Sequence, residues 1–126
     1  MMFGRKWVAD QLSTHPTGSR YICHPPVTDT DEDHVVLVPN IEVAAIRLEG
    51  DGWTVNRDDP AYQYGENNEV EFITARKGHL NLIIYDDHRG YSAFLAATEV
   101  AQILNLTDKE HRVALFKAVC GNRGRR

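Results

Sequence analysis

The strongest hydrophobic pattern in the chain is a pair of short apolar runs, Val35–Val38 and Leu80–Tyr85. Each run has the length of a β-strand and is rich in β-branched or aromatic residues. In the second run, both alternating sets of side chains are largely apolar. Such a pattern is typical of a central strand that is covered on both faces.

Two weaker patterns predict further strands. Trp53–Val55 is a short run with strand composition, and Val70–Ala75 is a longer one. A turn at Lys77 and Gly78 joins the longer run to the apolar strand at Leu80–Tyr85. The second half of the chain therefore contains a predicted hairpin.

Apolar residues at helical spacing predict four helices. Asn40 is a favourable N-cap for the second of them. Thr107 and Glu110 have the spacing of a capping box for the last. The predicted ranges are Phe3–Leu12, Ile41–Leu48, Tyr91–Leu104 and Asp108–Cys120.

These elements together predict an α+β fold, with a mixed twisted sheet of four or five strands and helices packed mainly on one face. The chain has 126 residues, of which 42% are apolar, which is enough for one packed core. We expect a single domain at 1–120 and a basic flexible tail at 121–126.

Composition also limits the classes of function. No run of about 18 apolar residues occurs, so no membrane span is expected. The N-terminal sequence MMFGRKWVADQL lacks the apolar core of a signal peptide, and the two cysteines, Cys23 and Cys120, fit a reducing compartment. These features predict a cytoplasmic protein. The net charge of −4 argues against nonspecific nucleic-acid binding.

The polar segment ahead of Val35–Val38 carries the clearest candidate chemistry. Gly18-Ser19 is followed by alternating acids at Asp29, Asp31 and Asp33. If the strand begins early, these carboxylates point to one side of it. Like charges on one face repel unless cations lie between them. The Gly-Ser pair offers backbone N–H groups that an anion could approach.

This order of residues resembles the nucleotidyltransferase fold of the DNA polymerase beta superfamily, in which a Gly-Ser pair precedes Asp-x-Asp and an apolar strand. The second half of the motif is either Asp29-Thr30-Asp31 or Asp31-Glu32-Asp33, and we prefer the latter because the apolar run follows it directly. The segments FITARKGHLNLIIYDD and FLAATEVAQILNLTDKEHRVALFKAV are similar to small nucleotidyltransferase-like proteins of bacteriophages. The resemblance implies a minimal nucleotidyltransferase fold and, for a phage protein, the host cytoplasm.

The resemblance also implies roles for individual residues. Asp31 and Asp33 would be catalytic and would hold Mg²⁺ or Mn²⁺, with Asp29 as a possible additional ligand. Gly18, Ser19 and Arg20 would bind the nucleotide. These roles are the ones that nucleotidyl transfer needs, namely carboxylates for the metal and positive or N–H groups for the phosphates.

The sequence leaves alternatives open for the third metal ligand and for the hairpin. The family usually has a third metal-binding carboxylate on a neighbouring strand, and here the candidates are Glu71 or, as a neutral amide in that place, Asn81. Arg76 and Lys77 lie at the predicted hairpin, where both could reach a phosphate, with Lys77 as the nucleotide-binding candidate, or both could face water.

Two functions remain open at this stage. The first is a metal-dependent nucleotidyltransferase that moves a nucleoside monophosphate from an NTP to the hydroxyl of a protein, an RNA end or a small molecule. The alternative is a catalytically silent protein of the same fold that binds a nucleotide or a host protein. Gly-x-Ser-x-Gly and P-loop motifs do not occur in the sequence, which argues against serine hydrolases and Walker-type NTPases.

Overall fold

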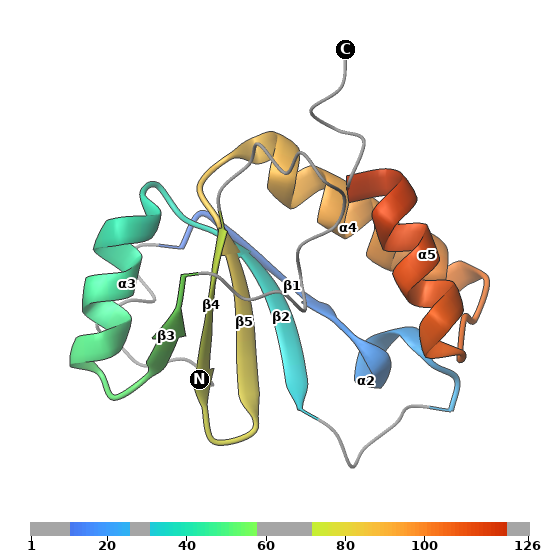
Figure 1. Cartoon of the computed structure of the whole chain (residues 1–126), viewed down its shortest axis with the longest axis horizontal. Coiled ribbons are helices and arrows are strands. Elements are labelled where there is room, and N and C mark those ends of the chain that lie inside the picture. The colour runs from blue at the N-terminus through green and yellow to red at the C-terminus, as the bar shows by residue number, and fades with distance from the viewer. Residues whose placement is uncertain (1–10, 26–30, 58–71, 121–126) are drawn as a thin grey trace.

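The computed structural model describes residues 11–25, 31–57 and 72–120, which form three layers (Figure 1). A five-stranded sheet lies in the middle. Helix α3 (Ile41–Gly50) covers one face, and α2 (Ser19–Ile22), α4 (His88–Ile103) and α5 (Lys109–Cys120) lie on the other. This arrangement confirms the predicted α+β class, the mixed sheet and the packing of most helices on one face.

The strands follow the order β1-β2-β5-β4-β3 across the sheet. Strands β2 and β5 are parallel, and every other neighbouring pair is antiparallel. The parallel pair in the centre places the beginnings of β2 and β5 at the same end of the sheet. The bounds are β1 Ser13–Thr17, β2 Glu32–Leu37, β3 Thr54–Asn56, β4 Phe72–Lys77 and β5 Leu80–Tyr85.

Strand β5 is central and covered on both faces, as its apolar pattern predicts. Leu82 and Ile84 belong to the core under α3, whereas Ile83 and Tyr85 belong to the core under α4 and α5. All four side chains are at most 1% exposed. Because successive strand residues point to opposite faces, a run that is apolar at every position must be buried twice.

The first strand is the main element that hydrophobic patterning does not predict. Strand β1 is a polar edge strand that pairs only with β2, and within it only Thr17 is buried. An edge strand with one buried side chain needs no apolar alternation, so its sequence resembles a loop. The helix predicted at Phe3–Leu12 lies mostly outside the described residues. Leu12 itself is not helical, because its backbone N–H donates to Leu37 O in the sheet.

Three boundaries differ from the sequence prediction, two at helix starts that other side chains cap and one at the hairpin turn. Helix α4 begins at His88, three residues early, since the Asp87 carboxylate accepts the Arg89 N–H. The first turn of α5 is capped by Asp108, which accepts from the N–H of Glu110, rather than by Thr107. Strand β4 continues to Lys77, so the hairpin turn consists of Gly78 and His79.

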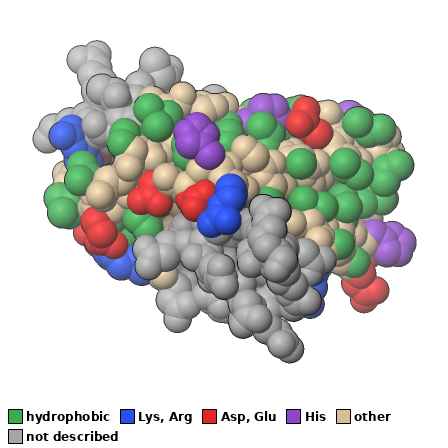
Figure 2. Space-filling view, turned by 90° about the horizontal axis from the view of Figure 1, so that it is seen from above, with side chains coloured by type: hydrophobic (Ala, Val, Ile, Leu, Met, Phe, Trp, Pro, Cys, Tyr) green, Lys and Arg blue, Asp and Glu red, His purple; other side chains and the backbone are tan. Residues whose placement is uncertain are grey.

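Figure 2 shows the end of the molecule at which β5 finishes. Charged side chains gather near its middle, and hydrophobic side chains spread over the half occupied by α4 and α5. At the end of α4, the large hydrophobic residues Val100, Ile103 and Leu104 are exposed. Among the helices that the structure describes, none has both the length and the apolar character needed to cross a membrane.

Candidate functional site

The candidate site lies where β2 begins, at the opposite end of the sheet from the view in Figure 2. Asp33 stands in β2 with Thr17 of β1 opposite it on one side and Asn81 of β5 on the other. The side chain of Asp33 points to the same face as Val35, which is the face of α2 and α4. The fully buried Asn81 donates from Nδ2 to Asp33 Oδ1 at 3.0 Å.

Gly18 contacts the same carboxylate from the other side. It follows β1 directly, has φ of 76°, and its carbonyl accepts from Ile22 N at 2.9 Å in the short helix α2. A Cβ at residue 18 would lie 2.1 Å from Asp33 Oδ2, closer than two atoms can approach. Both the backbone conformation and the contact therefore require glycine. The backbone of the Gly-Ser pair is held directly against the acid-bearing strand.

A buried hydroxyl pair fixes strand β1 to the helix beneath the site. Thr98 Oγ1 donates to the carbonyl of Phe94, one turn earlier in α4, at 2.9 Å. Thr17 Oγ1 lies 2.7 Å from Thr98 Oγ1 and therefore must be the donor, since the Thr98 hydroxyl has only one proton. The two residues are at most 2% exposed. The position of Gly18 is thus set by the residue immediately before it.

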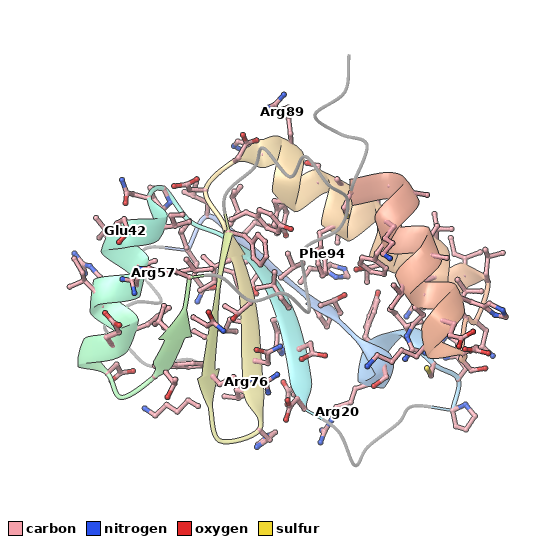
Figure 3. The ribbon with its side chains drawn as sticks, viewed as in Figure 1. Arg20, Glu42, Arg57, Arg76, Arg89 and Phe94 are labelled. Carbon is pink, nitrogen blue, oxygen red and sulfur yellow. The ribbon has the colours of Figure 1, made fainter. Side chains whose placement is uncertain are left out.

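Asp31 forms an ion pair with Arg76, whose side chain comes from β4. Arg76 pairs with Asn81 in the sheet, and Asn81 pairs with Asp33, so the three residues share one face across three strands. Both partners of the ion pair are about half exposed, with 50% of the Arg76 side chain and 41% of the Asp31 side chain accessible. In Figure 3, Arg76 lies at the end of the sheet where β2 begins, and Arg20 reaches from α2 toward that end.

The surroundings of Asp33 disfavour its negative charge. Burial raises the pKa of the Asp33 carboxyl above its ordinary value of 3.8, and the negative charge of Asp31 acts in the same direction. The hydrogen bond from Asn81 and the positive charges of Arg76 and His34 act in the opposite direction without cancelling the rise. A buried carboxylate beside a second acid gains from any additional cation in its neighbourhood.

The structure brings most of the predicted site residues to this end of the sheet. Gly18, Asp31 and Asp33 lie around one point, and Ser19 and Arg20 form the start of α2 directly after Gly18. Lys77 is separated from them, because it follows Arg76 in β4 and points to the opposite face. Its Nζ donates to Asp51 O at 2.7 Å, near the end of α3. Asp29 and Glu71 lie outside the described residues.

Sequence patterns do not reveal the pairing of Arg76 with Asp31. The available signal is the alternation within the hairpin, which places Arg76 and Lys77 on different faces and makes only one of them a neighbour of the acids. His34 points away from Asp33, as the same alternation predicts, and its Nε2 lies 2.8 Å from Glu32 Oε2. His79 Nε2 lies 3.8 Å from the other oxygen of Glu32, so these residues form a separate polar group.

The donor atoms at the site suit a hard divalent cation. Within residues 11–25, 31–57 and 72–120, no group of three or more His, Cys, Asp or Glu side chains could hold a metal ion. Mg²⁺, however, is commonly held by one or two carboxylates together with water and substrate phosphates rather than by a complete protein cage. Asp31 and Asp33 supply two such carboxylates on one side of β2. The described residues therefore fit a magnesium ion that arrives with a phosphate-bearing ligand.

Comparison with known proteins finds no match to the chain among family models, curated proteins or solved structures.

Proposed function

We propose that the protein is a metal-dependent nucleotidyltransferase, which moves a nucleoside monophosphate from an NTP to an acceptor hydroxyl. The observation that carries this proposal is the direct contact between Gly18 and the Asp33 carboxylate, with Asp31 two residues earlier. It brings the two halves of the motif, which are separated in sequence, to one point. A backbone that an anion can approach and a pair of acids that a cation can bridge are thereby adjacent.

The roles of the residues follow from the charge distribution at this point. Asp31 and Asp33 would hold Mg²⁺ or Mn²⁺, which when bound neutralises phosphate charge and orients the reacting groups. Gly18 and Ser19 would let the nucleotide phosphates approach the main chain closely. Arg76 and Arg20 would place guanidinium groups near the same phosphates, where charge-assisted hydrogen bonds form readily.

Positioning and charge compensation are sufficient for this class of reaction. Phosphoryl and nucleotidyl transfer need little covalent chemistry from the protein. The register of the central strands β2 and β5 and the hydrogen bond between the two side chains fix Asp33 and Asn81 relative to each other. The acceptor, which on this proposal is a protein, an RNA end or a small molecule, would have to be aligned by residues beyond this group or by a partner.

The alternative is a catalytically silent protein that binds a nucleotide or a host protein through the same fold. Two observations favour it. Asn81, one of the two candidates for the third metal ligand, is a neutral amide beside Asp33, and Arg76 already neutralises Asp31. A neutral amide is a weaker ligand for Mg²⁺ than a carboxylate, so catalysis would be less well supported than binding.

The experiment combines binding and transfer in the intact chain. Thermal unfolding is measured with Mg²⁺ or Mn²⁺ and each of the four NTPs, followed by transfer of label from the α-labelled form of any NTP that binds. A ligand at about 100 times its dissociation constant adds roughly 2.7 kcal/mol to the stability. For a domain of this size the midpoint rises by about 10 °C.

The matched variants are Asp31→Ala with Asp33→Ala, and Glu42→Gln as a control. Glu42 is an exposed acid on α3, across the sheet from the site (Figure 3). We expect metal-dependent binding and transfer in the parent and in Glu42→Gln, and neither in the double variant. Binding without transfer supports the silent alternative, and the absence of both in the parent contradicts the proposed function.

A further inference from the structure

The ion pair between Arg76 of β4 and Asp31, just before β2, places a positive charge at the candidate metal site. We propose that Arg76 is an internal counter-ion of Asp31 and Asp33, and that a divalent cation must displace its guanidinium group in order to bind. This inference rests on the proposed function, since it concerns the metal that Asp31 and Asp33 would hold. It assigns to Arg76 the role of a positioning residue that sets metal affinity.

The hairpin geometry makes this role specific to Arg76. The register of β4 with β5 pairs Arg76 with Asn81, and the register of β5 with β2 pairs Asn81 with Asp33. Side chains at these paired positions share a face of the sheet. The next residue, Lys77, is directed to the other face and binds Asp51 O. Of the two positively charged side chains of the hairpin, only Arg76 therefore reaches Asp31 and Asp33, and the register of β4 with β5 determines this choice.

The Arg76 guanidinium supplies positive charge next to the two carboxylates. Asp33 lies partly buried beside Asp31, and Arg76 is among the groups whose positive charge stabilises the ionised Asp33. The ion pair itself is half exposed to water. Exposed ion pairs contribute little to stability, so a cation that binds both carboxylates can displace the arginine. The long side chain would then remain close to the site and available to a phosphate oxygen.

The competition is measured with Mn²⁺ alone. Mn²⁺ binding to the full chain is followed by the electron paramagnetic resonance signal of the free ion, for the parent and for Arg76→Gln, Arg76→Lys and Arg57→Gln. Arg57→Gln is the matched control, because it removes the same charge from an arginine that pairs with Glu42 and Glu49 on α3 (Figure 3). Far-UV circular dichroism confirms that each variant is folded.

We expect Arg76→Gln to bind Mn²⁺ about two- to fivefold more tightly than the parent, which corresponds to the loss of one exposed ion pair. Arg76→Lys keeps a positive charge and should remain within about twofold of the parent, and Arg57→Gln should equal it. An affinity of Arg76→Gln that equals or falls below that of the parent overturns the inference while the metal site stands. If neither the parent nor Arg76→Gln binds Mn²⁺, the metal site of the proposed function fails, and the inference fails with it.

Discussion

Gly18 is the residue on which the geometry of the site depends most directly. Its φ of 76° lies in the region that only glycine adopts without strain, and a Cβ there would overlap with Asp33 Oδ2. Any larger residue must therefore change its own backbone and also push away the Asp33 carboxylate. Strain and collision act together at this position.

Replacement of Gly18 with Ala is expected to lower the free energy of unfolding by about 2–4 kcal/mol, since the collision adds to the backbone strain. Chemical denaturation measures this loss. Gly78→Ala is the control, because Gly78 also has a positive φ, of 63°, but a Cβ there would meet no atom within 4 Å. That variant should lose only about 1–2 kcal/mol. Equal losses in the two variants would contradict a collision between a side chain at residue 18 and the Asp33 carboxylate.

Asp33 should make the stability of the metal-free protein depend on pH in an unusual direction. Its folded pKa is raised above the value of 3.8 that it has in the unfolded chain, so the folded state holds the proton more tightly. The free energy of unfolding therefore falls as the pH rises from below 3.8 through the raised pKa, because ionised Asp33 is disfavoured in the fold. This cost is fully present above the raised pKa.

Asp33→Asn is consequently expected to raise the melting temperature at pH 7, and this gain should shrink as the pH falls through the raised pKa and should be lost below 3.8. Melting temperatures in the presence of EDTA test the prediction.

Asp87→Asn is the control, with an expected pH dependence of opposite sign, because a hydrogen bond from the Arg89 N–H lowers the pKa of Asp87. Its stabilisation is present above 3.8 and is lost as the pH falls through the lowered pKa, so this variant should be less stable at pH 7 and should converge with the parent in acid. A loss of stability at neutral pH in Asp33→Asn contradicts the assignment.

Two adjacent acids at the end of β5 begin helices on opposite faces of the sheet. Asp86 Oδ2 accepts the N–H of Ile41 at 3.0 Å, at the start of α3, and Asp87 accepts from the first turn of α4. Because β2 and β5 are parallel, this end of β5 is remote from the beginning of β2. The pair therefore has a structural role and does not join Asp31 and Asp33.

Asn40 completes the start of α3 by accepting the N–H groups of Glu42 and Val43, at 2.9 and 3.1 Å. Asn40→Ala leaves both N–H groups without this acceptor and should cost about 1 kcal/mol, or about 3–5 °C in melting temperature. Asn40→Asp keeps an acceptor oxygen at the cap and should stay close to the parent. Scanning calorimetry compares the three proteins. An unchanged melting temperature for Asn40→Ala would mean that Asp86 and water suffice to cap the helix.

The elements that the sequence predicts well are those whose pattern reflects burial. Strand β5 is apolar on both faces, and α3 has buried residues at Ile41, Ala44, Ala45 and Leu48, spaced as in an amphipathic helix. The polar edge strand β1 has no such pattern. Its structure comes instead from pairing with β2 and from the hydroxyl pair of Thr17 and Thr98, which are 81 residues apart. Contacts of that range leave no periodic signal in the chain.

The candidate site also combines features that the sequence predicts with features that depend on long-range contacts. The order of Gly18, Asp31 and Asp33 before an apolar run predicts that they meet only through the family resemblance, since the pairing of β1 with β2 that brings them together has no local signal. The neighbours on β4 and β5 depend on strand order and register, which join segments more than 40 residues apart. Asn81 could be singled out as a possible neighbour, but the selection of Arg76 over Lys77 needs the hairpin register.

The residues of the candidate site therefore lie on strands that differ in stability. Asp33 and Asn81 stand on the two buried central strands, whereas Gly18 follows a polar edge strand that pairs on only one side. Local opening in proteins begins at such weakly packed edges and reaches the central strands only near global unfolding. The phosphate-binding side of the proposed site should hence open more often than the acid-bearing side.

Amide hydrogen exchange tests this difference, with the amides of β1 expected to exchange faster than those of β2 and β5.

Thr98→Val makes the test more specific, because it removes the acceptor of the buried Thr17 hydroxyl. A buried group left without its partner costs roughly 1–3 kcal/mol. Exchange in β1 should then accelerate by about tenfold or more, while the amides of β5 keep a larger share of their protection. A uniform acceleration across both strands would instead show that β1 opens only when the entire sheet unfolds. In that case Gly18 would be held as firmly as Asp33, and the two halves of the site would form one rigid unit.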